Sequence, residues 1–175
     1  MEKKTTKYEN PSFMQSITIS NNWCKEWEDD LLSDEVLADR IAELTKTKNG
    51  LRGFFAYTLS DIDCKLLDKL PTPVVFKLRE GGESIVEIIV KNLVMSTAQI
   101  FNHQKNMNLD YAEKSTNISE RCKNLLRVMD TKLVTKMINE VIQNLDKIGN
   151  SMDNSTRYND GQIELIMQKI KEISH

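Results

Sequence analysis

The sequence predicts an all-α protein, a single-domain bundle of six to seven helices around a central buried helix at residues 83–105. Residues 83–105 carry polar side chains three or four apart and apolar ones almost everywhere else, which indicates a helix with one narrow polar stripe. Other segments also repeat apolar residues at helical spacing. The aromatic run at residues 51–59 has no second convincing strand with which to pair, so we expect it to be helical.

The length and composition are those of one folded core. The chain has 175 residues, of which 39% are hydrophobic and 29% charged, which fits neither a disordered nor a membrane protein. We expect residues 1–20 to form a flexible N-terminal arm and residues 21–175 to form a single helical domain. The N-terminus lacks the apolar segment of a signal peptide, and the central helix lacks an uncharged run of the ~20 residues that a bilayer requires. We therefore expect no secretion and no membrane span.

The first helices are predicted from aromatic spacing and capping residues. Trp23, Trp27 and Leu31 are four apart and share one helical face. We expect this face to anchor its helix on the core, and the alternative is a contact with a partner, because tryptophan is enriched at binding hot spots. Ser33 precedes two acidic residues and predicts the start of a second helix, which we expect to end at Asn49-Gly50.

Proline and glycine punctuate the chain before the central helix. Residues 61–70 predict a short helical turn that Pro71 stops, and Pro73 suits the first turn of the next helix. Gly81 and Gly82 then break that helix.

Capping residues also mark the C-terminal half. Residues 106–116 are polar and predict a linker, after which Asn117 begins a pattern typical of a capping box. Asp130 is expected to cap a helix whose apolar stripe keeps its period until Gly149. After a polar loop, Asn159 and the glutamine three residues later predict the last helix.

The sequence contains no convincing catalytic, cofactor or metal site. His103 is the one histidine away from the C-terminus, and its place on the polar stripe predicts a polar rim residue. No histidine spacing typical of zinc or di-iron sites occurs. The three cysteines lie far apart, which argues against a disulfide framework, and Cys122 falls on an apolar face. Glu87 and Lys91 are best interpreted as an i,i+4 ion pair.

The charge balance argues against nucleic-acid binding. The chain has 24 basic and 26 acidic residues, a net charge of −2, whereas nucleic-acid readers concentrate basic residues on one face. A weak RNA contact through Arg121, Lys123 and Arg127 is a further alternative.

Short phrases in the middle of the chain resemble an uncharacterised family of small proteins from cyanobacteria and algal plastids. The resemblance covers about residues 23–129 and depends on the phrases Arg52-Gly53-Phe54-Phe55, Lys77-Leu-Arg-Glu-Gly-Gly-Glu83, Val90-Lys-Asn-Leu-Val-Met-Ser-Thr-Ala98 and Arg121-Cys122. It implies a location in the plastid stroma or the bacterial cytoplasm and brings no activity. The abundance of Lys, Asn and Ile beside six arginines is typical of an AT-rich genome and fits a plastid.

The leading functional hypothesis is a non-enzymatic helical protein that binds another protein, as an assembly or regulatory factor of a photosynthetic cell. The candidate partner-binding residues are Trp23, Trp27, Glu87, Lys91, Asn92 and Ser96. The alternative is a small enzyme or ligand-binding protein with a pocket at the polar stripe, for which Glu83, His103 and Arg121 are the candidate lining residues beside Glu87 and Lys91. A pocket requires these side chains to converge on one cavity.

Overall fold

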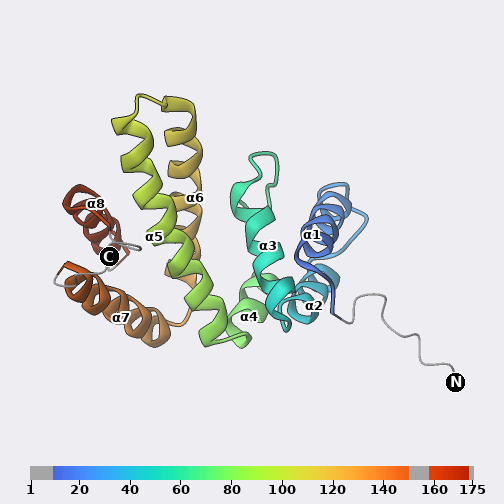
Figure 1. Ribbon diagram of the computed structural model, residues 1–175. Coiled ribbons are helices and arrows are strands. Elements are labelled where there is room, and N and C mark those ends of the chain that lie inside the picture. Colours follow the sequence, from blue (N-terminus) through green and yellow to red (C-terminus); the bar gives the residue numbers. More distant parts are fainter. Residues whose placement is uncertain (1–9, 150–157, 174–175) are drawn as a thin grey trace, which may run out of the picture. The chain divides into compact units, whose positions relative to one another are not determined.

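The computed structural model describes residues 10–149 and 158–173, the side chains of residues 146–149 excepted. These residues form eight α-helices and no strand, which confirms the predicted all-α class with one helix more than expected (Figure 1). Their internal contacts group the chain into two units, Met1–Gly81 (unit 1) and Gly82–His175 (unit 2). The boundary between the units falls at the glycine pair that was expected to end the preceding helix. Each unit has buried apolar residues of its own.

Unit 1 consists of four helices, α1 (Phe13–Glu28), α2 (Asp34–Leu44), α3 (Lys48–Ser60) and α4 (Thr72–Glu80). Helix α1 packs mainly on α3, and α2 packs mainly on α4. The largest fully buried side chains of this unit are Leu37, Ile41, Phe54, Phe55, Leu66, Val74 and Leu78. The phenylalanine pair meets edge to face, with 5.1 Å between the ring centroids.

Helix α1 begins earlier than the sequence analysis placed it. Residues 13–20 were expected in a flexible arm, but they are helical because Ser12 and Gln15 form a capping box. The Gln15 backbone N–H donates to Ser12 Oγ over 3.2 Å, and the Ser12 N–H donates to Gln15 Oε1 over 2.8 Å. Residues 1–9 of the expected arm lie outside the described residues.

The connection between α2 and α3 also differs from the prediction. Asn49-Gly50 was expected to end the second helix, but α2 ends at Leu44 and the dipeptide lies in the first turn of α3. Thr47 caps α3, since its Oγ1 accepts the Gly50 N–H over 3.0 Å. The helical interpretation of residues 51–59 is confirmed.

The proline and glycine signals before the central helix are largely confirmed. The segment 61–70 is irregular except for one hydrogen-bonded turn at residues 66–68. Pro73 lies in the first turn of α4. Gly82 has φ +64°, a left-handed conformation that glycine adopts without strain, and it precedes the first residue of the next helix.

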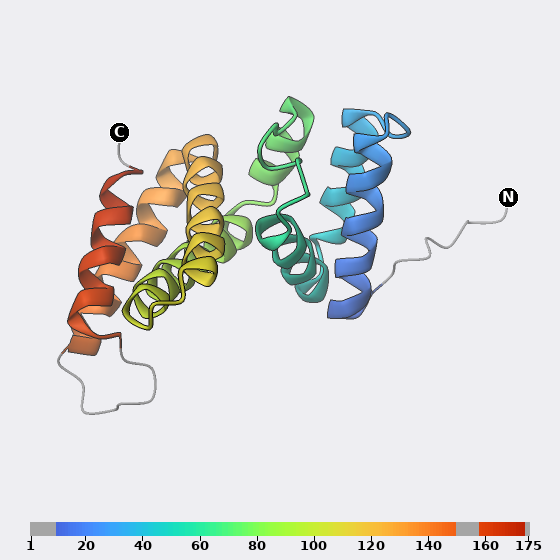
Figure 2. The same ribbon diagram turned by 90° about the horizontal axis from the view of Figure 1, so that it is seen from above.

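Unit 2 is organised by the predicted central helix. Its four helices are α5 (Glu83–Lys105), α6 (Leu109–Val128), α7 (Thr131–Gly149) and α8 (Asp160–Lys171). Helix α5 has the predicted bounds and contacts all three of the others, of which α6 runs beside it as a hairpin (Figures 1 and 2). The buried residues of α5 are Ile85, Val86, Ile89, Val90, Leu93, Val94, Ser96, Thr97, Ala98 and Ile100. The predicted buried helix is confirmed.

Helix α6 contradicts the expected linker at residues 106–116. The chain reverses within a few residues at Met107, and α6 begins at Leu109, so Asn117 lies inside the helix and does not start it. The interface between α5 and α6 also includes small polar residues. Ser119 is fully buried, and its Oγ lies 3.3 Å from Thr97 Oγ1 on α5. Small side chains allow two helices to approach closely, and the hydropathy pattern did not reveal them.

The starts of α7 and α8 agree with the predicted capping residues. Asp130 Oδ1 accepts the Leu133 N–H over 3.0 Å. At α8, Asn159 and Gln162 form both bonds of a capping box, each 2.9 Å long. The predicted loop between the two helices falls mostly outside the described residues.

By length and composition alone, α5 is the one helix among the described residues that could cross a membrane. In the structure, 56% of its most apolar stretch is buried. Burial of this kind against α6, α7 and α8 is what the core helix of a helical unit shows.

Candidate interaction surfaces

The tryptophan pair of α1 lies in the contact between α1 and α2. Trp23 is only 6% exposed, and the guanidinium of Arg40 lies 5.7 Å from its ring centroid. Trp27 is half-buried, and its Nε1–H donates to Asp34 Oδ1 over 2.7 Å. Leu31 is 73% exposed beyond the end of α1 and does not share the face of the two indoles. The pair therefore anchors α1 within unit 1, as the first interpretation predicted.

The polar stripe of α5 is only partly open to solvent. Glu87 and Lys91 are exposed and form the predicted ion pair, with 2.6 Å between Lys91 Nζ and Glu87 Oε1. Asn92 and Ser96 instead bond to carbonyl groups of α5 itself. Ser96 is 6% exposed whereas Met95 is 59% exposed, the reverse of what the hydropathy pattern suggested. Of the stripe residues proposed for partner binding, Glu87 and Lys91 are the exposed ones.

The pocket candidates do not converge. Glu83 and His103 are separated by 20 residues of α5, which corresponds to ~30 Å along the helix axis. Glu83 pairs with Lys136 of α7 over 2.9 Å, and the His103 ring lies against Tyr111. Arg121 is 9% exposed inside unit 2. These side chains therefore belong to three different places and do not line one cavity.

Four charged side chains of α6 and of the α8 end form a partly buried cluster, the ion quartet (Glu120, Lys123, Lys169 and Glu172). Lys123, which is 5% exposed, contacts Glu120 over 2.9 Å and also pairs with Glu172. Lys169 lies 3.2 Å from Glu120 and 3.7 Å from Glu172. Of the three cations named for an RNA contact, Arg121 and Lys123 are thus buried and only Arg127 is exposed.

The contacts within the quartet shift the pKa values of Glu120, Lys123 and Glu172. Burial raises the pKa of Glu120, but hydrogen bonds from Lys123 and Lys169 lower it by more, so the net shift is downward. The hydrogen bond from Lys123 is the main cause of the lowered pKa of Glu172. Burial opposes the charged form of Lys123, yet its two carboxylate partners raise its pKa overall. The charged forms of Glu120, Lys123 and Glu172 are therefore favoured.

The buried cysteines are in environments that disfavour the reactive thiolate form. Burial raises the pKa of the Cys122 thiol to about 12, which agrees with its interpretation as a small core residue. Cys24 and Cys64 lie together in unit 1. The pKa of the Cys24 thiol is raised mainly by its hydrogen bond with Cys64 and secondly by burial. All three cysteines are at most 1% exposed.

Sequence reasoning missed an apolar surface at the turn between α5 and α6, the hairpin tip (His103, Met107, Leu109, Tyr111 and Lys114). Its three large apolar side chains are strongly exposed, Met107 by 81%, Leu109 by 65% and Tyr111 by 54%. Met107 also has φ +56°, a left-handed conformation that is uncommon for a residue other than glycine. The signal available in the sequence was the run of Met, Leu and Tyr in a segment otherwise polar enough to suggest a linker.

The aromatic ring of the hairpin tip is held in place by its neighbours. The His103 ring lies 5.5 Å from the Tyr111 ring, centroid to centroid, at an angle of 32°. Lys114 Nζ lies 5.2 Å from the centroid of the same ring. Tyr111 is therefore exposed to solvent while its ring is oriented by two neighbouring side chains.

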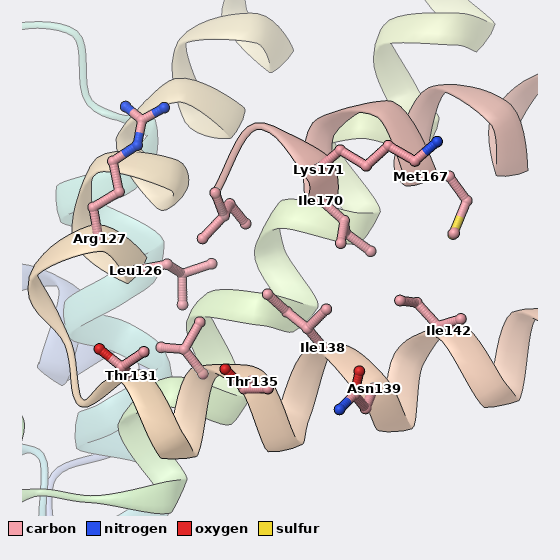
Figure 3. Close-up of a pocket in the computed structure, with 12 residues that line it drawn as sticks. Leu126, Arg127, Thr131, Thr135, Ile138, Asn139, Ile142, Met167, Ile170 and Lys171 are labelled. Atoms are coloured by element: carbon pink, nitrogen blue, oxygen red, sulfur yellow. The ribbon is translucent and has the colours of Figure 1, made fainter. Parts of the chain in front are cut away.

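A second surface is the α7–α8 groove, a cavity of about 320 Å³ bounded by the end of α6, by α7 and by α8 (Figure 3). The residues that line it are Leu126, Arg127, Thr131, Val134, Thr135, Ile138, Asn139, Ile142, Met167, Ile170, Lys171 and Ile173. Seven of these twelve residues are apolar, and the two charged ones are both cations. It contains none of the residues that the sequence analysis proposed for a pocket.

No group of three or more histidine, cysteine, aspartate or glutamate side chains capable of holding a metal ion occurs in the described part of the chain. The described residues that line the α7–α8 groove include no histidine and no carboxylate.

Residues 12–173 match the family model described as uncharacterised conserved protein UCP020893. This range includes helices of both units and extends beyond the phrases between residues 23 and 129 that suggested an uncharacterised family. No curated protein and no solved structure matches the chain.

Proposed function

The chain belongs to the family of uncharacterised conserved protein UCP020893, and we propose that it is a non-catalytic helical protein that binds another protein through the hairpin tip. The observation that supports this function is the exposure of Met107, Leu109 and Tyr111 within one turn. Clustered exposed apolar side chains typically mark interaction sites, and tyrosine is enriched among interface hot spots. A partner that covers the tip would bury an aromatic side chain whose orientation is already fixed.

Two energetically unfavourable features coincide at this turn, which supports a functional role for it. The left-handed backbone at Met107 costs a non-glycine residue roughly 1–2 kcal/mol. The same turn exposes large apolar side chains to water, although a tight helical connection can be made from polar residues and glycine. Local departures from folding rules concentrate at functional sites.

The exposed residues of α5 provide a polar margin for the same contact. Glu87, Lys91, Met95 and Gln99 are exposed at four-residue spacing, and the next position in this row is His103 of the hairpin tip. Because a row of this spacing slants around the helix, a partner would follow it only over the turns nearest the tip. Polar rims around an apolar centre are the usual anatomy of protein interfaces.

We further propose that the protein acts as an assembly or regulatory factor in the plastid stroma or in the cytoplasm of a photosynthetic bacterium. The resemblance of the phrases between residues 23 and 129 and the arginine-poor, lysine-rich composition support this setting. Fractionation of cells with an antibody against the full chain tests it, and recovery outside these compartments would contradict it.

The binding function is tested by affinity purification from native extract with mild cross-linking and quantitative mass spectrometry. The bait is the full chain, compared with a tip variant that carries Met107→Ser, Leu109→Ser and Tyr111→Ala, and with Phe76→Ala as a control. Phe76 is 57% exposed in unit 1, so it matches the exposure of Tyr111. We expect one protein to be recovered in near-stoichiometric amount with the wild type and the control and to be lost with the tip variant. Recovery of no stoichiometric partner, or retention of the partner by the tip variant, refutes the proposal.

A further inference from the structure

We infer that the α7–α8 groove binds an amphipathic helix of a partner protein, with acidic residues flanking the apolar face of that helix. The groove is a different surface from the hairpin tip, and none of its lining residues belongs to the tip. It can therefore bind a helix whether or not the tip has a partner of its own.

The floor of the groove consists of aliphatic side chains that the neighbouring helices do not fully cover. Val134 and Ile138 of α7 and Ile170 of α8 are 6%, 8% and 4% exposed, and Ile142 and Met167 are half-buried. Figure 3 shows Ile138 and Ile142 of α7 on the side of the groove opposite Ile170 and Met167 of α8. A volume of about 320 Å³ takes a few aliphatic side chains and not a whole helix. The occupant therefore lies over the groove and inserts one apolar face.

The edges of the groove repeat with helical spacing. Thr131, Thr135 and Asn139 follow one another at four-residue intervals along α7, over ~12 Å of helix axis, and all three are exposed. Met167 and Lys171 have the same spacing on α8. Two helical edges around an apolar floor form the geometry that receives the i, i+3, i+4 and i+7 side chains of an amphipathic helix.

The charge of the groove selects an acidic occupant. Among the described residues, Arg127 and Lys171 are the charged ones that line the groove, although the chain as a whole has a net charge of −2. The Arg127 guanidinium donates to the Glu172 carbonyl oxygen over 3.0 Å and to Asn124 Oδ1 over 3.1 Å, so its charge is held by neutral acceptors. The Glu172 carboxylate is engaged by the ion quartet and does not line the groove. Rim cations of this kind accelerate association with a partner of opposite charge.

The ion quartet holds α8, one wall of this groove, in place beside α6. It joins Lys169 and Glu172, at the end of α8, to Glu120 and Lys123 of α6. The lining residues Ile170 and Lys171 lie between the two tethered positions of α8. The wall formed by α8 is thus fixed before any helix binds, which reduces the entropy lost on binding.

The test is a selection of displayed helical peptides of random surface composition against the purified full chain. We expect the enriched peptides to share apolar residues at i, i+3 or i+4 and i+7 with an excess of aspartate and glutamate beside them. Fluorescence polarisation with the best labelled peptide then measures its affinity. Lys171→Glu should weaken the affinity about tenfold, and Ile142→Glu, which places a carboxylate in the wall, should weaken it by more.

Lys132→Glu is the matched control, because Lys132 is an exposed residue of α7 outside the groove and its substitution changes the net charge by the same amount. Circular dichroism and thermal melting establish that each variant is folded, and Lys171→Glu alters only an exposed side chain. Enrichment of neutral or basic peptides, or of no helical peptides, overturns the inference. It is also overturned if binding survives both groove substitutions, or if the groove takes dodecanoate and no peptide.

Discussion

The imidazole ring of His103, near the end of α5, lies against the phenol ring of Tyr111, in the first turn of α6, with 5.5 Å between the ring centroids. This contact spans the turn that contains Met107 and orients a tyrosine that is still 54% exposed. His103 was considered as a pocket residue from the sequence alone. Its place in the structure makes it a support for the hairpin tip.

We expect the two residues to contribute unequally to partner binding. Tyr111→Ala should weaken the affinity for the partner at least about tenfold, because it removes the anchoring side chain. His103→Ala should weaken it about threefold, because the ring of Tyr111 loses one contact but keeps Lys114. Titration calorimetry with the purified partner measures both. Equal losses, or a larger loss for His103→Ala, would show that His103 itself contacts the partner.

The ion quartet should contribute more to stability than an exposed ion pair of the same type. Lys123→Met keeps the aliphatic stem but removes the more deeply buried of the two cations that Glu120 and Glu172 share, and we expect the free energy of unfolding to fall by about 1–3 kcal/mol. Lys136→Met breaks the exposed pair with Glu83 and should leave stability nearly unchanged. Urea denaturation of the full chain measures both variants. The prediction fails if the two substitutions have similar effects.

Acid should reduce the stabilisation that the ion quartet provides. The pKa values of Glu120 and Glu172 are lower in the folded chain than the ordinary value of 4.5, so below that pH the unfolded state takes up protons first. Their stabilisation is complete above the ordinary value and is lost as the pH falls through the folded-state values. We therefore expect stability to decrease from about pH 5 to about pH 3, and Lys123→Met to reduce this slope. An unchanged slope in that variant would show that the acid sensitivity of the protein does not arise from the quartet.

The close approach of α1 and α3 depends on Gly53. A Cβ atom at this position would lie 2.4 Å from the Cβ of Ser16, far inside contact distance. Overpacking costs about 1–3 kcal/mol and alanine regains about 1 kcal/mol of helix propensity, so Gly53→Ala should lower the stability by up to about 2 kcal/mol. Asn49→Ala, at an exposed position of α3, controls for propensity. A melting temperature for Gly53→Ala equal to that of the control would contradict the packing seen here.

The three thiols should be unreactive in the folded chain. Cys24, Cys64 and Cys122 are buried, and the pKa values of Cys24 and Cys122 are raised, so little thiolate is present or accessible at neutral pH. We expect Ellman's reagent to modify none of them in native buffer and all three in denaturant. Modification of any thiol on the time scale of a free cysteine would reveal an open site in either unit.

The sequence predicted the elements that depend on strong local signals. The central helix 83–105 was found with its bounds because nearly all of its faces are apolar, and Gly82, Pro73 and Asn159 act locally in the structure as their chemistry predicts. The residues Arg52-Gly53-Phe54-Phe55, which suggested a family, are explained by packing. Arg52 lies 5.1 Å from the Phe13 ring, Gly53 permits helix contact, and both phenylalanines are buried.

The parts that sequence reasoning missed depend on contacts between distant residues. The first turns of α6 resembled a linker because the buried residues between positions 109 and 116 are Ala112 and Ser115, neither of which is a large apolar residue. Further along α6, Ser119 is buried against Thr97 and Lys123 between two carboxylates, and the residue types alone do not indicate this burial. The hairpin tip was missed for a related reason, because exposure of Met107 and Leu109 is a property of the folded turn and not of the residue types.

Site-specific photo-cross-linking in native extract tests the binding function most directly. Benzoylphenylalanine is placed at position 111 of the full chain, and in a second sample at position 76, where Phe76 is similarly exposed in unit 1. Protein binding through the hairpin tip predicts one dominant adduct from position 111, and the purified adduct partner should bind the wild type but not Tyr111→Ala. Absence of an adduct at position 111, or the same adducts in similar yield from both positions, would contradict it.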